Sequence, residues 1–305
     1  MTRSTGNFDD FGVATATLAG PLEARLAALR DAGFTQVMLD AGDLAQHPGG
    51  VAGAARAVQA SGLRVSGLQW LRDYEGLPGR LHDHKLEMAK ALLQMAHTLG
   101  APMLLVSSSS HRAAAQDPAA VARDLRKLAV LAVPLGLKVA YEGAGAGHTV
   151  HDCFGAWDAV YQADMPNLGL AIDGLHTALG SIPLEDLDFI EPRKIFVVRL
   201  ADVLESAAPA GPAVGRAAQQ QVFPGEGAHN EQVAALVLRL AGLGFRGDWS
   251  LEVVNDEHRQ LPPPLVARRA RTAAQWLGED VLRRSVPLPG RMRLRPGRTT
   301  TSPTP

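Results

Sequence analysis

The chain has 305 residues, of which 46% are hydrophobic, 20% charged and 5% aromatic, and its net charge is −1. This composition predicts a globular protein and excludes the basic field and the aromatic stacking surface that nucleic-acid-binding proteins use. The only cysteine, Cys153, excludes an internal disulfide framework and favours a reducing cytoplasm.

No stretch of the sequence approaches the roughly 18 apolar residues of a membrane span. Residues 1–10 lack the apolar segment of a secretion signal. We therefore expect a cytoplasmic protein that has neither a membrane nor a nucleic-acid partner. The sequence leaves the oligomeric state open.

In the first half of the chain, short β-type runs alternate with segments whose apolar residues recur at helical spacing. Proline and glycine mark several helix ends: Pro21 begins and Gly33 ends the first predicted helix. Asp117 is a predicted N-cap before Pro118. The predicted strands are 11–17, 36–39, 64–69 and 103–107, and the predicted helices are about 21–33, 50–60, 81–99 and 118–135.

The second half of the chain continues this alternation. The predicted strands are 138–142, 169–173, 195–199 and 249–253, and the predicted helices are about 152–163, 183–190, 230–243 and 264–277. Eight strand–helix pairs in succession predict an α/β fold, a single (β/α)8 TIM barrel. The Ala/Gly/Pro-rich loop 205–221 is of a length that is usually functional.

The two ends of the chain fall outside the alternation. We expect residues 1–10 to form an N-terminal extension and residues 11–278 to form the barrel. After Gly278 the apolar periodicity is lost, and arginines alternate with proline, glycine and threonine. This composition predicts a disordered basic tail over residues 279–305.

Charged residues lie at or next to the C-terminal ends of the last four predicted strands, and these are Glu142, Asp173, Arg199 and Glu252. Because side chains alternate along a strand, each shares a face with residues two positions away, which for Arg199 are Val197 and Ile195. The opposite face, expected to point outward against helices, carries Tyr141, Ile172, Phe196, Val198 and Leu251. The four charged side chains should therefore converge at the C-terminal end of the barrel, where such barrels carry their active sites.

Three carboxylates in one mouth repel one another unless a cation or protons intervene. Oxygen-only ligation suits a hard ion such as Mg²⁺ or Mn²⁺, so Glu142, Asp173 and Glu252 are candidate metal ligands. A single strand-end acid is as often a cap or a surface ion pair, but three in one register favour a site. His176 is a candidate general acid or base, or a ligand of a substrate hydroxyl. Arg72 could clamp a substrate carboxylate or pair with a neighbouring acid.

Several motifs, in chain order, resemble a known family. The sugar phosphate isomerase/epimerase superfamily of xylose isomerase-like TIM barrels is similar at Glu142, Asn167–Thr177, Phe223–Gly227 and Ser250–Asp256. Within it, the bacterial 3-dehydroshikimate dehydratases also resemble Arg72–Gly76 and Ala140–Glu142. The likeness covers about residues 11–277. It implies a divalent metal, Mg²⁺ or Mn²⁺, on the residues matching Glu142, Asp173 and Glu252, with His176 reaching the substrate.

Arg199 departs from the family pattern, because the family usually has His or Gln there as a further metal ligand. A guanidinium has no free lone pair and cannot ligate. A metal could be retained with Arg199 moved onto Asp202 or onto a substrate carboxylate, or the guanidinium could be a permanent replacement cation among the acids. A wrong strand register is the third interpretation. Gln219–Gln221 also stand where the family tends to carry a basic residue before Phe223.

The expected function is that of a 3-dehydroshikimate dehydratase-like lyase, which removes water from a cyclic hydroxy-keto acid. A base takes the proton next to the carbonyl while a cation stabilises the enolate oxygen. We expect His176, Glu142 and Glu252 to share the proton transfers, and Arg72, His176 and Arg199 to bind this small-molecule substrate.

Two alternatives remain open. The first is a sugar or sugar phosphate isomerase or epimerase, in which Glu142 and Glu252 flank the reacting carbon of a keto-sugar. The second is a barrel that has lost catalysis and has a binding role, which Arg199 and the missing basic residue suggest. Sequence alone identifies neither the substrate nor the metal.

Overall fold

The computed structural model of the protein describes residues 8–180, 183–204 and 220–284. In this part of the chain, eight parallel strands close into a barrel in the order β1-β10-β7-β6-β5-β4-β3-β2. The predicted single (β/α)8 TIM barrel is confirmed. Its strands are β1 Phe11–Ala14, β2 Gln36–Asp40, β3 Arg64–Arg72, β4 Met103–Ser107, β5 Lys138–Glu142, β6 Leu168–Asp173, β7 Ile195–Leu200 and β10 Asp248–Leu251.

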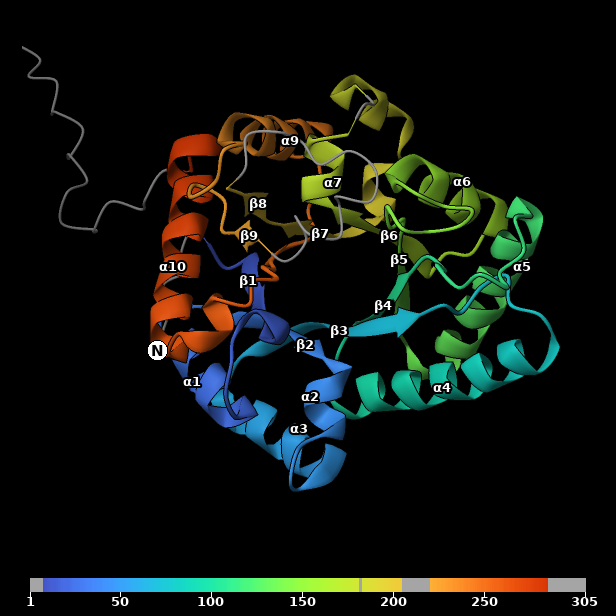
Figure 1. The fold of residues 1–305 in the computed structure, drawn as a ribbon, viewed down its shortest axis with the longest axis horizontal. Helices are drawn as coiled ribbons and strands as arrows, with labels where there is room; N and C mark the ends of the chain where they lie inside the picture. The colour runs from blue at the N-terminus through green and yellow to red at the C-terminus, as the bar shows by residue number, and fades with distance from the viewer. Residues whose placement is uncertain (1–7, 181–182, 205–219, 285–305) are drawn as a thin grey trace, which may run out of the picture.

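Helices form a ring outside the strands (Figure 1). Several begin where an acid caps the first turn, as at Asp117, whose side chain accepts the N–H of Ala119 at 3.0 Å, and at Asp152, which accepts that of Gly155 at 2.9 Å. The α-helices are α1 Leu22–Asp31, α2 Ala41–Ala45, α3 Gly50–Ser61, α4 Gly79–Thr98, α5 Pro118–Ala132, α6 Cys153–Ala163, α7 Gly174–Ala178, α9 Asn230–Leu243 and α10 Pro263–Gln275.

Several predicted elements differ from the structure. The predicted helix 183–190 is a 3-10 segment, η3 Leu184–Phe189, which buries only Leu187. The α-helix after β6 is instead α7, because Asp173 caps it directly by accepting the N–H of His176 at 3.1 Å. The first strand ends at Ala14, and the threonines that follow form a 3-10 turn, Thr15–Thr17.

The predicted long loop 205–221 lies mostly outside the described residues. Its last residue belongs to a short strand, β9 Gln221–Val222, which pairs antiparallel with β8 Asp202–Val203. This two-stranded ribbon leaves the barrel directly after β7. It brings the Phe223–Gly227 motif back against the barrel, where Phe223 is fully buried.

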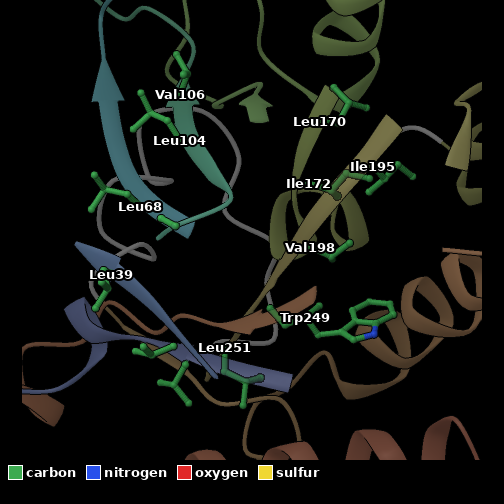
Figure 2. Packing of buried hydrophobic residues seen from close by; sticks show 14 of the residues in the cluster. Leu39, Leu68, Leu104, Val106, Leu170, Ile172, Ile195, Val198, Trp249 and Leu251 are labelled. Atoms are coloured by element: carbon green, nitrogen blue, oxygen red, sulfur yellow. The ribbon is translucent and has the colours of Figure 1, made fainter. Parts of the chain in front are cut away.

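Two hydrophobic clusters lie on opposite faces of the barrel wall. The large outer cluster fills the layer between strands and helices, and Figure 2 shows part of it, including Leu39, Leu104, Ile172 and Trp249. The small inner cluster fills the barrel interior with Ala14, Met38, Met103, Leu105, Ala140, Ala171, Phe196 and Val197, and with Trp70 against them. Tyr141, Ile172, Val198 and Leu251 belong to the outer cluster, as predicted.

Phe196 corrects the predicted faces of β7. The pairing of β6 with β7 shifts from Leu170–Ile195 to Ala171–Val197, so Phe196 is an extra residue in the ladder. Phe196 consequently lies with Val197 in the interior, and Ile195 packs outward. A Cβ added at Gly169 would lie 2.6 Å from the Phe196 ring, so the ring occupies space that only glycine leaves open.

The chain segments before β1 and after α10 meet against the barrel. A Cβ at Gly278 would lie 2.3 Å from the Phe8 ring, and Arg284 forms a two-bond ion pair with Asp10 at 2.6 and 2.7 Å. The chain is helical to Val281. Residues 8–10 and 279–284, just beyond the predicted boundaries at residues 10 and 278, thus contact one another beside β1. Residues 1–7 and 285–305 lie outside the described residues.

None of the helices in the described ranges is long and apolar enough to span a bilayer.

Candidate active site

The guanidinium of Arg199 lies at the centre of the charged residues that end the strands. Its Nη1 lies 2.8 and 2.6 Å from the two carboxylate oxygens of Glu142 and 3.8 Å from Oδ2 of Asp173. Its Nε donates to Oε2 of Glu252 at 2.9 Å. The structure thus brings together the four residues that the strand parity places at one mouth.

Strand pairing explains why these side chains meet. Arg199 pairs in register with Asp173 on β6 and with Ser250 on β10, and the backbone N–H of Glu252 donates to the carbonyl oxygen of Leu200 at 3.1 Å. Beyond the bulge at Phe196, the parity of β7 again points Arg199 inward. The shift in register therefore changes the faces of Ile195 and Phe196 in the N-terminal half of β7 but leaves Arg199 in the site.

Two residues of β3 that the sequence analysis did not include support the cluster. The side-chain amide of Gln69 donates to Oε1 of Glu252 at 3.2 Å, and the ring of Trp70 lies 4.5 Å from the Arg199 guanidinium carbon. A cation over an aromatic face is attracted to it. The strand runs to Arg72 rather than to Gln69. An aromatic residue next to a predicted strand end was the signal available in the sequence.

Burial and neighbouring charges set the protonation of the acids in opposite directions. Burial raises the pKa of Glu142 to about 7, although the charge of Arg199 works against this rise. Burial would also raise the pKa of Asp173, but pairing with His176 and the charge of Arg199 outweigh it and hold that pKa well below its usual range. The site thus combines a carboxyl whose pKa lies near neutral pH with one that stays ionised.

His176 joins this cluster to a cavity. Its Nδ1 lies 3.6 Å from Oδ2 of Asp173, and this pairing raises the pKa of the imidazole against the opposing effect of burial. The side chain is 38% exposed. A cavity of about 240 Å³ opens beside it, with lining residues that include Gly143, Cys153, Phe154, Asp173 and Leu187. A protonatable imidazole therefore lies between buried charges and a space of small-molecule size.

The glycine-rich loop after β5 lies against His176. A Cβ at Gly145 would lie 2.3 Å from the imidazole Nε2, and a Cβ at Gly143 would lie 1.9 Å from the carbonyl oxygen of Asp152. Residues 143–147 are not among the site residues predicted from the sequence. Gly145 is needed because the loop backbone lies close to His176, and Gly143 because it lies close to the backbone of Asp152.

Arg72 is not part of the charged cluster. Its guanidinium carbon lies 5.6 Å from the centre of the Trp70 ring, which also contacts Arg199. The acids after it do not pair with it, since Asp73 accepts the N–H of Ser110 and Glu75 accepts the hydroxyl of Tyr141. Arg72 lies exposed at the edge of the mouth, where a role in binding substrate stays a prediction.

The Pro-Gly-Glu-Gly motif also lies outside the cluster. Glu226 forms a two-bond ion pair with Arg269 of α10 at 2.8 and 2.7 Å. Asp202, a suggested alternative partner of Arg199, accepts the backbone N–H groups of Val203 and His229 instead. The described contacts therefore leave Arg199 with the three acids of the mouth.

This arrangement does not match the metal site that the sequence predicts. A divalent ion needs the carboxylate oxygens around one shared point at about 2.0–2.6 Å, and Nη1 of Arg199 fills the space between Glu142 and Asp173. Among the described residues, no group of three or more His, Cys, Asp or Glu side chains is arranged to hold a metal ion. The residues present do not fit a resident metal in this geometry.

Residues 26–279 match the family model of xylose isomerase-like TIM barrels. The chain belongs to this family. Two curated relatives are the 3-dehydroshikimate dehydratase of Pseudomonas aeruginosa, 34% identical over 251 residues, and the inosose isomerase of Bacillus licheniformis, 31% identical over 149 residues. These matches cover 82% and 48% of this chain and 39% and 51% of the relatives. The resemblance predicted from the motifs is confirmed.

Two solved structures agree with the fold. A fusion protein of a xylose isomerase-like TIM barrel with a 4-hydroxyphenylpyruvate dioxygenase superposes with a TM-score of 0.83 at 29% identity, over 90% of this chain and 44% of that one. The IolI protein with a bound zinc atom superposes with a TM-score of 0.76 at 19% identity, over 89% and 98%. The chain spans about two fifths of the length of the dehydratases and of the fusion protein it matches.

Proposed function

We propose that the chain is a lyase that removes water from a cyclic hydroxy-keto acid of the 3-dehydroshikimate type. One observation carries this proposal: a buried guanidinium held among carboxylates lies next to His176, in a chain 34% identical to a 3-dehydroshikimate dehydratase. An enolate needs a cation at its oxygen and a base at the neighbouring carbon. The mouth offers a candidate for each task.

In the proposed reaction, His176 takes the proton from the carbon next to the ketone. The electrons of that C–H bond move into the enolate, whose oxygen accepts a hydrogen bond from Arg199. Nη2 of Arg199 donates to none of the described residues and is free for this contact. When the enolate collapses, the C–O bond of the β-hydroxyl breaks and Glu142 supplies the proton that makes it water.

The direct test is an assay of purified protein with 3-dehydroshikimate, in which protocatechuate formation is followed by ultraviolet absorbance and mass spectrometry. His176→Ala should lower kcat by about 10²–10⁴-fold, the usual contribution of a general base. His97→Ala is the matched control, since His97 lies on α4 and contacts the carbonyl oxygen of Leu135. Equal activity of His176→Ala and the wild type would contradict the assignment.

A second candidate is an isomerase or epimerase acting on a keto-sugar through the same enolate. The 31% identity to an inosose isomerase favours it, as does the position of Glu142 and Glu252 on two sides of Arg199. Proton exchange at the carbon next to the ketone, seen by NMR in D2O without protocatechuate formation, would select this candidate. Binding of a keto-acid without exchange or product would select a barrel with a binding role only.

A further inference from the structure

We propose that Arg199 is the resident cation of this site and that it excludes a divalent metal. The inference rests on the proposed function only for what the cation does to substrate, not for its position. The family's usual ligand acids are all present as Glu142, Asp173 and Glu252. What differs is that a side-chain nitrogen, rather than empty space, lies between them.

The first support is the position of Nη1. It lies within 2.8 Å of both oxygens of Glu142 and 3.8 Å from the nearer oxygen of Asp173. An ion bound by these acids would have to occupy the same volume. Because a guanidinium has no lone pair, it cannot become a ligand when an ion approaches. It would have to leave.

The second support is that Arg199 is held on several sides. Its Nε donates to Glu252, whose other oxygen accepts the amide of Gln69 at 3.2 Å, and Trp70 covers the guanidinium face at 4.5 Å. The side chain is only 14% exposed. Among the described acids outside the mouth, Asp202 is already bonded to two backbone N–H groups and offers no alternative partner.

The third support is charge. A guanidinium remains protonated at any workable pH, so its positive charge is permanent. A divalent ion placed beside it would gain the carboxylates but would also be repelled by the guanidinium at close range. The arginine therefore opposes metal binding twice, by volume and by charge. It also supplies a cation that neither a chelator nor metal depletion can remove.

The test is metal binding, measured on the full chain without any assay of turnover. Calorimetric titration with Mn²⁺ and melting curves with and without EDTA are recorded for the wild type, for Arg199→Gln and for Arg193→Gln. Arg193 is the matched control, because it is 90% exposed and pairs only locally with Glu191 at 2.7 Å. The wild type and Arg193→Gln should bind no Mn²⁺ and should melt at the same temperature with and without EDTA.

Arg199→Gln removes the guanidinium and adds an oxygen that can ligate. It should bind Mn²⁺ at least about tenfold more tightly than the detection limit at which the wild type shows no binding, and Mn²⁺ should raise its melting temperature, because a ligand that binds only the folded state stabilises it. Arg199→Lys keeps the charge and should remain indifferent to Mn²⁺.

Two results would overturn the proposal. One is a wild type that purifies with stoichiometric metal or melts at a lower temperature in EDTA. The other is an equal response to Mn²⁺ in the wild type and Arg199→Gln. If Arg199→Gln does not fold, the metal content and EDTA response of the wild type decide the question alone. Absence of protocatechuate formation would count against the proposed lyase but leave this result standing.

Discussion

The two ends of the barrel each carry an arginine that links strands, but the surroundings of the two differ. At the N-terminal end Arg64 of β3 pairs with Asp248 of β10 at 2.6 and 3.0 Å and with Gln36 of β2, and its side chain is 52% exposed. At the C-terminal end Arg199 contacts three acids and is 14% exposed. The same residue type thus performs a surface task at one end and a buried one at the other.

The contrast shows why a charge is replaceable in one place and not in the other. An exposed ion pair contributes about 0–1 kcal/mol, because water solvates either partner once the other is removed. Breaking a buried pair costs about 3–5 kcal/mol, because the remaining charge stays in a poorly solvating environment. Removing Arg64 from the N-terminal end of the barrel should therefore cost less stability than removing Arg199 from the mouth, where the acids need a cation.

The largest effect is expected from Arg199→Met, which leaves Glu142, Asp173 and Glu252 facing one another without a cation. The free energy of unfolding should fall by about 3–5 kcal/mol, as for other broken buried pairs. Urea denaturation in buffer free of divalent ions measures this change.

Arg64→Met is the matched control for this substitution. It removes a pair whose arginine is 52% exposed but whose Asp248 is 17% exposed, and it should lower the free energy of unfolding by about 1 kcal/mol, less than Arg199→Met does. Equal losses for the two variants would show that burial does not distinguish the two ends.

Phe196→Ala tests whether the lower half of the barrel serves stability rather than activity. The ring is 7% exposed in the interior, with Nζ of Lys138 4.6 Å from its centre. Removing it should lower the free energy of unfolding by about 3 kcal/mol, the low end for a buried phenylalanine. The rate of protocatechuate formation should stay that of the wild type when assayed well below the melting temperature. A slower rate without a stability change would contradict this division of tasks.

Glu75→Gln is expected to have a smaller, pH-dependent effect. One oxygen of Glu75 accepts from Tyr141 Oη at 3.0 Å and from the N–H of Ser109, and the other is buried without a described hydrogen-bond partner. Burial raises the pKa of Glu75 above its usual value. The folded protein therefore holds a proton that the unfolded chain releases, so stability falls as pH rises from the ordinary pKa to the raised one.

Glutamine cannot ionise, so the Glu75→Gln variant should lack this part of the decline. Its free energy of unfolding should exceed that of the wild type by about 1 kcal/mol at pH 8, on the scale of one buried hydrogen bond. Near pH 4 the two free energies should be equal. Urea denaturation at the two pH values makes the comparison. The same difference at both values would show that the carboxyl is not the group that titrates.

Much of the barrel follows from local sequence. The predicted runs 103–107 and 138–142 coincide with β4 and β5. Both ends of each run are marked by a change in local residue type, which the sequence shows directly. The convergence of Glu142, Asp173, Arg199 and Glu252 follows from parity, which is also local. The sequence left three interpretations of Arg199 open. In the structure its guanidinium lies among the three acids.

What the sequence did not predict depends on neighbouring strands. The bulge at Phe196 arises from how β7 pairs with β6, and nothing within 195–199 itself signals it. The extension of β3 to Arg72 likewise accompanies a register shift against β4. That extension adds Trp70, which lies against Arg199, to the strand that carries Gln69. Residues whose roles come from a partner strand are those that single-strand patterns miss.

The cluster around Arg199 also bears on the rates of folding and unfolding. Its two shortest ion pairs join residues 57 and 53 positions apart in the chain. Contacts between distant residues close long loops, so they form only after much of the barrel has been assembled. Interactions absent from the transition state act mainly on the unfolding rate. The arginine that sets the charge of the mouth should therefore also slow the unfolding of the barrel.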